Sequence, residues 1–276
     1  MSEPHHPRTV VISGGTDGMG RALALARAAR GDRVVAIGSN ADKGTRLLAE
    51  ANGRVEFLQA DLSSVAETKR VIDTIAENHT TVDGLCLFAN RQSPKRTETP
   101  EGLERTFALY YLSRHLLGRG LGPLLGRSRN PVIVNVAGVG MTKGEIHWDD
   151  LQLSRGYGMI AAQLQAGRAN DLLGVAYAAE PAGPAKYVLY HPGFTKSGDL
   201  SPLPAAGRVL LRLAAGVAAH SVERSVAPIH GFLDRPPAAR LTANDRGREL
   251  PLTLPTLNRA NASRLAEATA KLLAEI

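Results

Sequence analysis

The sequence has little cysteine, few aromatic residues (4%) and no long apolar run. Its single cysteine, Cys86, excludes an internal disulfide framework, a thiolate zinc site and a Cys-x-x-Cys redox pair. We expect Cys86 to be a small buried side chain in the run LCLFA. The chain lacks the roughly 18 consecutive apolar residues of a membrane span, and MSEPHHPRT lacks a secretory apolar core. We therefore expect a cytoplasmic protein that does not bind membranes.

Clustered charge is also missing. The formal net charge is +7, from 33 Lys and Arg against 26 Asp and Glu, but the basic residues are mostly arginines scattered one or two at a time. A nucleic-acid surface needs these charges gathered on one face. The pattern predicts no nucleic-acid partner and favours a small-molecule ligand.

Strand-like and helix-like segments alternate along the chain, with no linker and no internal repeat to divide it. Such alternation is typical of an α/β protein, because parallel strands need helical crossovers. The sequence predicts one domain over 1–276: a Rossmann-like, doubly wound parallel sheet with helices on both faces. We expect strands at 9–13, 33–38, 55–60, 84–89, 131–137 and 186–191, and helices at 18–30, 41–51, 65–78, 101–118 and 160–178.

Residues 198–237 interrupt this alternation. Pro-rich loops bound the segment, and Ala and Leu lie on most faces of the one or two helices that it predicts. An ordinary pair of packing helices is one interpretation. The other is a substrate lid, which we predict because doubly wound sheets bind ligands at the carboxyl ends of their strands, and the segment follows one.

A glycine-rich stretch, SGGTDGMG, joins the first expected strand to the first expected helix. Gly14 allows a tight turn, Gly18 lets backbone approach a pyrophosphate, and Gly20 lets the helix pack closely on the sheet. Backbone N–H groups and the positive end of the helix dipole then face the phosphates. The stretch predicts dinucleotide binding.

The spacing Gly-x3-Gly-x-Gly resembles the short-chain dehydrogenase/reductase family, with Ser13 where that family usually has Thr. The resemblance extends to ADLSS beside adenine, to LFANR, to the helix TPEGLERTFALYYLSRHLL and to the nicotinamide loop HPGFTKS. It implies a cofactor site made of Ser13, Gly14, Thr16, Asp17, Gly18, Met19, Gly20, Ser39, Asn40, Asp61, Leu62, Ala89, Asn90, Pro192, Gly193, Phe194 and Thr195.

The choice of cofactor depends on the end of the second expected strand. NAD-binding proteins usually place an acidic residue there, whose charge repels a 2′-phosphate. Here the segment AIGSNADKG has no acid before Asp42, while Ser39 and Asn40 can donate hydrogen bonds, with Arg21 or Lys43 nearby. We expect NADPH.

The family resemblance also implies a catalytic set of Ser, Tyr, Lys and Asn, and this chain lacks it. IVNVAG places Gly138 at the Ser position, and FALYYL places Tyr110 at the Asn position. AGRANDLL places Gln163 at the Tyr position and Gly167 at the Lys position. The chain is thus similar to atypical family members of antibiotic biosynthesis that reduce angucyclinone-like ketones with NADPH and take the proton from the substrate.

Other residues near the expected cleft have alternative roles. Tyr157 is the nearest tyrosine but has no lysine four residues later, so we expect it to form an aromatic wall and leave it as a secondary proton donor. His147 and His191 can titrate near neutrality, although loop packing explains both. Lys143 and Thr142 border the cleft, and we expect substrate contacts from Gly138, Lys143, Tyr157 and Gln163.

These features together predict an NADPH-dependent ketoreductase of an aromatic polyketide, since a phenol beside the ketone can supply the proton. Hydride transfer is cofactor chemistry, which the protein supports by orientation. A catalytically silent NADP(H) sensor or scaffold is the alternative, and a conventional dehydrogenase using Tyr157 is a third. The family implies a homo-oligomer, although the lid leaves a monomer open.

Overall fold

The computed structural model describes residues 7–141, 143–181, 183–193 and 221–276. It contains an 8-stranded sheet with the order β3-β2-β1-β4-β5-β6-β7-β8. All neighbouring strands are parallel except β7 and β8. This arrangement confirms the Rossmann-like fold. The strands are β1 (Thr9–Ser13), β2 (Arg33–Gly38), β3 (Val55–Gln59), β4 (Gly84–Leu87), β5 (Val132–Val136), β6 (Lys186–His191), β7 (Leu241–Asp245) and β8 (Arg248–Leu250).

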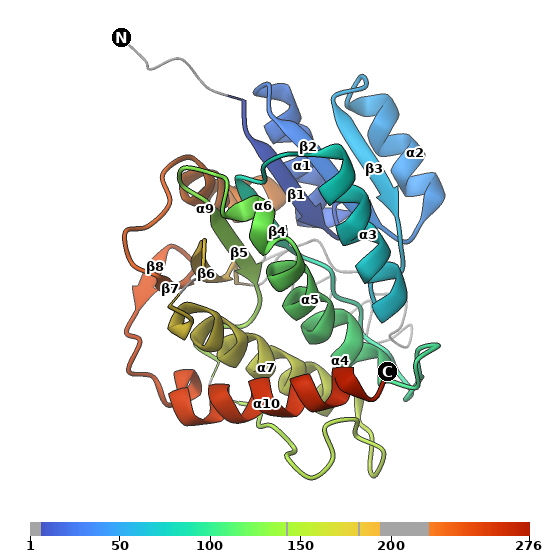
Figure 1. Ribbon diagram of the computed structural model, residues 1–276, viewed down its shortest axis with the longest axis vertical. Helices are drawn as coiled ribbons and strands as arrows, with labels where there is room; N and C mark the ends of the chain where they lie inside the picture. Colours follow the sequence, from blue (N-terminus) through green and yellow to red (C-terminus); the bar gives the residue numbers. More distant parts are fainter. Residues whose placement is uncertain (1–6, 142, 182, 194–220) are drawn as a thin grey trace.

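Helices cover both faces of this sheet (Figure 1). The helices α3, α5 and α7 lie on one face, and α10 runs beside α7 as an outer helix. The helices α1 and α9 pack together on the other face. Their bounds are α1 (Gly18–Ala29), α2 (Ala41–Glu50), α3 (Val65–Asn78), α4 (Arg105–Phe107), η1 (Ala108–Leu112), α5 (Ser113–Gly120), α6 (Gly122–Leu125), α7 (Met159–Ala179), α9 (Val222–Asp234), η2 (Pro255–Leu257) and α10 (Arg259–Ala274).

The strands are apolar on both faces because a helical layer covers each one. In β1, Val11 packs into the core beneath α3, α5 and α7, while Val10 and Ile12 pack into the core beneath α1 and α9. Cys86 in β4 is fully buried, as the sequence predicts, and burial raises the pKa of its thiol to about 12. The two cores hold the strand ends in fixed positions at the edge where the loops meet.

Two parts of the fold differ from the sequence predictions. The helix expected over 101–118 begins at Arg105, and its middle is a π-helical turn at Ala108–Leu112. The strands β7 and β8 were not predicted, because LTAND and REL are short and largely polar. They pair through a two-residue turn in which Arg246 and Gly247 both have positive φ, a geometry that suits a tight hairpin.

The segment predicted as a lid, 198–237, lies in part outside the described residues, which resume at 221. Its later part is helix α9, which begins at Val222 after the N-cap Ser221. Val226, Ile229 and Leu233 of this helix are buried in the core against α1 and the sheet. Residues 222–234 are therefore a packing helix, and the prediction of a lid over residues 198–220 falls outside the described residues.

Candidate active site

The glycine turn between β1 and α1 packs closely against the loop after β4 and against the start of α1. Gly14 has φ +69°, and a Cβ there would lie 2.9 Å from the backbone nitrogen of Ala89. A Cβ on Gly20 would lie 2.2 Å from the carbonyl oxygen of Gly14, closer than real atoms approach. The Asp17 side chain accepts a hydrogen bond of 2.8 Å from the Gly18 nitrogen and caps α1. The Gly18 N–H is thus taken by Asp17, while Met19 and Gly20 at the same helix N-terminus line the cavity described next.

A cavity of about 480 Å³ lies beside this turn, at the carboxyl ends of the strands. This size is within the usual range of cofactor sites. Its position is the one at which doubly wound sheets bind ligands. The lining residues are Gly14, Thr16, Asp17, Gly18, Met19, Gly20, Ile37, Gly38, Ser39, Asn40, Lys43, Ala60, Asp61, Leu62, Phe88, Ala89, Asn90, Arg91, Arg105, Leu109, Val136, Ala137, His191, Pro192 and Gly193.

The structure therefore brings together all but three of the residues expected at the cofactor. Ser13 does not line the cavity. Ser13 is fully buried, and its Oγ accepts hydrogen bonds from the backbone nitrogens of Phe88 at 3.2 Å and Ala89 at 3.4 Å. It therefore joins β1 to the loop after β4. Phe194 and Thr195 lie outside the described residues.

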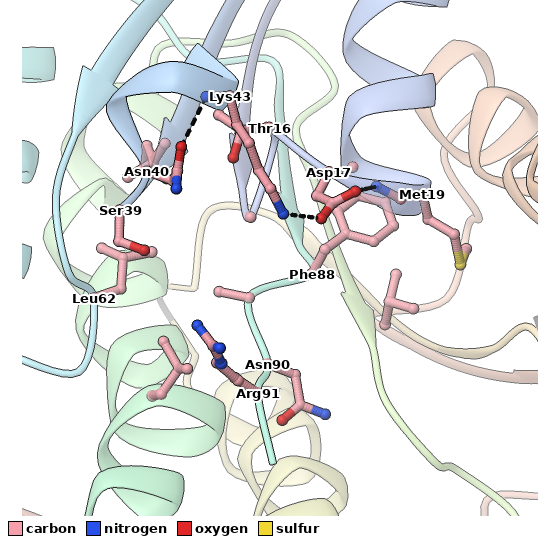
Figure 2. A pocket seen from close by; sticks show the side chains of 18 of the residues that line it. Thr16, Asp17, Met19, Ser39, Asn40, Lys43, Leu62, Phe88, Asn90 and Arg91 are labelled. Atoms are coloured by element: carbon pink, nitrogen blue, oxygen red, sulfur yellow. Dashed lines mark hydrogen bonds and ion pairs between the residues drawn. The ribbon is translucent and has the colours of Figure 1, made fainter. Parts of the chain in front are cut away.

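Polar side chains gather where β2 ends, on one side of the cavity (Figure 2). Asn40 caps α2, since its Oδ1 accepts a 2.8 Å hydrogen bond from the Lys43 nitrogen. The Asn40 amide NH2 therefore remains a donor. The Lys43 ammonium crosses the cavity edge to the carboxylate of Asp17. With Ser39 beside them, these groups offer donors and a cation at the place where an NAD site has an acid.

The arginines around this cavity differ from the sequence expectation. Of the two basic residues named as alternatives near the cofactor, Lys43 lines the cavity, whereas Arg21 pairs with Glu50 and does not line it. Arg105 does line it, and its Nη2 donates to Asp61 at 2.7 Å. Arg91, in the loop after β4, also lines it (Figure 2). Sequence reasoning missed both, although both lie in stretches that resemble the family, because the resemblance named only Ala89 and Asn90 in the first and no cofactor contact in the second.

A smaller cavity of about 150 Å³ gathers the four positions expected to replace the catalytic set. The four positions come from three segments, η1, the loop after β5, and α7. Their convergence supports the register assigned from the sequence. The cavity is lined by Tyr110, Gly138, Met141, Lys143, Gln163, Leu164, Gly167, Arg168 and Asp171.

An amide pair stands between the two cavities. Asn90 lines the larger and Gln163 the smaller, and each Nδ2 or Nε2 donates to the other side chain's oxygen at 3.2 Å. Gln163 Nε2 also donates to the Arg91 carbonyl at 3.4 Å. Both amide hydrogens of Gln163 therefore have acceptors in this state. The Gln163 amide is therefore held against Asn90 and the loop after β4.

A buried polar network holds Tyr110 in place. The π-helical turn leaves the Tyr110 carbonyl to accept a 2.7 Å hydrogen bond from Asn170 Nδ2, and such turns recur at functional sites. The Arg114 guanidinium lies 4.6 Å from the Tyr110 ring centroid and donates to the Val136 and Ala89 carbonyls. Burial lowers the Arg114 pKa to about 10 and raises the Tyr110 pKa. Tyr110 is thus a neutral phenol at physiological pH.

The alternative candidates lie elsewhere. Tyr157 lines neither cavity, and its hydroxyl donates to the Ser93 carbonyl at 2.7 Å. The hydroxyl of Tyr157 is therefore already engaged in this structure, and its placement at the substrate stays a prediction. His147 is exposed and lines neither cavity. His191 lines the larger cavity, with its Nδ1 2.9 Å from Asp245 Oδ1.

Sequence reasoning missed two charged residues of the smaller cavity, Arg168 and Asp171. The sequence could have predicted the position of Asp171, because residues four apart on a helix lie on the same face. Gln163, Gly167 and Asp171 follow this spacing along α7. The pairing of Asp171 with Arg168, at 2.8 Å, required coordinates.

Comparisons with known proteins agree with this geometry. A family model described as short chain dehydrogenase matches residues 8–149. The human "Polyprenol dehydrogenase" is 29% identical over 59% of this chain and 52% of its own length. The "Putative daunorubicin C-13 ketoreductase DnrU" of a Streptomyces species is 27% identical over 67% of this chain and 65% of its own. The chain thus spans roughly half to two thirds of these relatives.

Solved structures show the same fold. A short-chain dehydrogenase from Streptomyces avermitilis has a TM-score of 0.65 at 19% identity, covering 100% of this chain and 96% of that one. A short chain dehydrogenase from Shigella flexneri, complexed with NADP, has a TM-score of 0.63 at 17% identity, covering 87% and 97%. No helix among the described residues is long and apolar enough to cross a membrane. The glycine cradle, the strand order and the matched family model show that this chain belongs to the short-chain dehydrogenase family.

Proposed function

We propose that the protein is an NADPH-dependent oxidoreductase that reduces a ketone on an aromatic, angucyclinone-like polyketide, in antibiotic biosynthesis. The bound nicotinamide would supply a hydride to the carbonyl carbon. The observation that carries the proposal is the small cavity beside the dinucleotide site, at positions where the family resemblance places catalytic side chains.

The dinucleotide fits the larger cavity on structural grounds. A Cβ would clash with backbone at both Gly14 and Gly20, so these glycines let the turn pack tightly beside the cavity, as a dinucleotide-binding turn requires. The α1 N-terminus would hold the pyrophosphate. Ser39, Asn40 and Lys43 would hold a 2′-phosphate, which supports NADPH over NADH.

The space in the smaller cavity comes from two glycines. A Cβ at Gly167 would have no neighbour within 4 Å, and one at Gly138 would lie 3.5 Å from the Met141 Cγ. The volume of about 150 Å³ suits the edge of a ring rather than a whole polycyclic molecule. The rest of the substrate would extend outward past Met141, an apolar side chain that is 45% exposed. Because Gly138 and Gly167 have no side chains, a group of the substrate would fill the space that they leave.

The absent tyrosine and lysine support a proton supplied by the substrate. A positioned general acid is typically worth 10²- to 10⁴-fold in rate, and a phenol hydrogen-bonded to the ketone can take over this task. Tyr157 donates its hydroxyl to the Ser93 carbonyl and is not available for it. Two relatives support a redox enzyme by name, the "Putative daunorubicin C-13 ketoreductase DnrU" and the "Oxidoreductase andH" of Emericella variicolor (28% identical), and the first also supports a ketone substrate.

The test uses matched ketones. Pure protein and NADPH are mixed with aromatic ketones that carry a hydroxyl beside the carbonyl, and with the O-methyl ethers of the same ketones. We expect NADPH absorbance to fall with the hydroxy ketones and about 10²-fold more slowly with the ethers. Equal rates would contradict proton supply by the substrate.

The rival function is a catalytically silent NADP(H)-binding sensor or scaffold. It shares the glycine cradle, so binding of NADPH alone does not separate the two. Tight NADPH binding in calorimetry, together with no turnover of any ketone, would favour the sensor. Turnover of a hydroxy ketone would exclude it.

A further inference from the structure

The smaller cavity contains a carboxyl group that the proposed function does not use. Asp171 lies on α7 and is only 2% exposed. Its Oδ2 accepts a 2.8 Å hydrogen bond from Arg168 Nη1. Its Oδ1 is buried and accepts no hydrogen bond from the part of the chain that the structure describes. An unsatisfied buried carboxylate oxygen is costly and needs an explanation.

Arg168 only partly balances this carboxyl group. Its other N–H groups donate to the carbonyls of Gly144 at 3.0 Å and Met141 at 3.1 Å, and so hold the loop after β5. Burial accordingly outweighs the Arg168 charge and raises the Asp171 pKa to about 7. The group therefore exchanges a proton near neutral pH, as a general acid must.

The position of Asp171 connects it with the reaction site. It is one helical turn beyond Gly167, whose missing side chain leaves the cavity open, and it lines this cavity with Tyr110. The charged and titratable groups around it are Arg168 on its own helix, Tyr110 on η1 and Lys143 on the loop after β5. Of these, only Arg168 forms an ion pair with Asp171.

We propose that Asp171 is the acid that returns a proton to the substrate in this cavity, an inference that rests on the proposed function. Reduction leaves the ketone oxygen negatively charged, and the neighbouring phenol passes its proton to it. The O–H bond of the Asp171 carboxyl then breaks, and a new O–H bond forms on the phenolate oxygen. The carboxylate remains paired with Arg168 until it takes up a proton from the solvent, which is the one proton that the overall reduction consumes.

The test compares Asp171→Asn with Asp149→Asn, the same change at an exposed carboxyl that lines neither cavity. Wild-type turnover of a hydroxy ketone should fall as the pH rises through about 7, because the acid form is lost. D171N should lose 10²-fold or more in kcat and lose this inflection, with KM for NADPH unchanged. Asp171→Glu should keep an inflection, and D149N should match the wild type.

A measurement without turnover separates this role from a merely structural one. Infrared difference titration of the protein alone should show a carboxyl band that disappears as the pH rises through about 7, and that D171N lacks. An active D171N with an unchanged pH profile would overturn the inference and leave the proposed function standing. A wild-type protein that reduces no ketone would overturn both.

Discussion

The buried carboxyl of Asp171 predicts an unusual dependence of stability on pH. Its pKa is about 7 in the folded protein, against 3.8 for an ordinary aspartate. A raised pKa means that the folded state holds its proton more tightly than the unfolded state. Stability is therefore greatest below pH 4 with respect to this group, and it is lost as the pH rises to about 7.

The magnitude follows from the size of the shift. About 3 pKa units at 1.36 kcal/mol each give a cost of about 4 kcal/mol above pH 7. Roughly 3 kcal/mol of this develops between pH 5 and pH 8, because part of the cost is already present at pH 5. Asp171→Asn removes the titration, and its side-chain oxygen can still accept from Arg168. The variant should therefore gain stability over the wild type as the pH rises.

The assay is urea unfolding at pH 5 and pH 8, with the free energy of unfolding extrapolated to water. The difference between D171N and wild type should grow by about 3 kcal/mol from pH 5 to pH 8. Other titrating groups, such as the buried His115 whose pKa is about 4, act equally on both proteins and cancel. Parallel pH curves for the two proteins would refute the argument, and Asp149→Asn serves as the exposed control.

Three further predictions concern the cofactor site and Tyr157. Gly20→Ala should weaken NADPH binding at least 10²-fold in calorimetry with the protein still folded by circular dichroism, because its Cβ would displace the turn at Gly14; near-normal affinity would show that the turn can relax. Ser39→Asp should raise the Kd for NADPH by 10-fold or more and change that for NADH little, since a carboxylate repels a 2′-phosphate; equal effects would remove the case for NADPH. Tyr157→Phe should leave kcat within about tenfold, because the hydroxyl donates to the Ser93 carbonyl, whereas a loss of 10² or more would restore a tyrosine acid.

Much of the site was predictable from the sequence because it depends on short segments. The glycine spacing around Gly14 and Gly20, and the apolar strands on either side of it, place the dinucleotide cavity. The segment order also placed Tyr110, Gly138 and Gln163 at one small cavity. Strand ends in a parallel sheet meet at a common edge, so order along the chain translates into neighbourhood in space.

Other features followed only from partners that are distant in the chain. The π-helical turn at Tyr110, the pairing of Arg21 with Glu50 and the bond from Tyr157 to Ser93 all override what the residue types suggest. Each depends on contacts between segments that are far apart in the chain, and local sequence patterns do not predict such contacts. The polar strand β7 was missed for the same reason, since its place beside β6 rather than its composition makes it a strand.

The sequence by itself determined six of the eight strands and the glycine turn after the first, because propensity, periodicity and spacing act within a few residues of one another. The replacement of the tyrosine–lysine pair is what the family resemblance implies. Only the tertiary structure decided the charge state of Asp171. A carboxyl titrates near neutrality when burial outweighs its ion pair, and both the burial and the sharing of Arg168 with the loop after β5 come from the packing of separate segments.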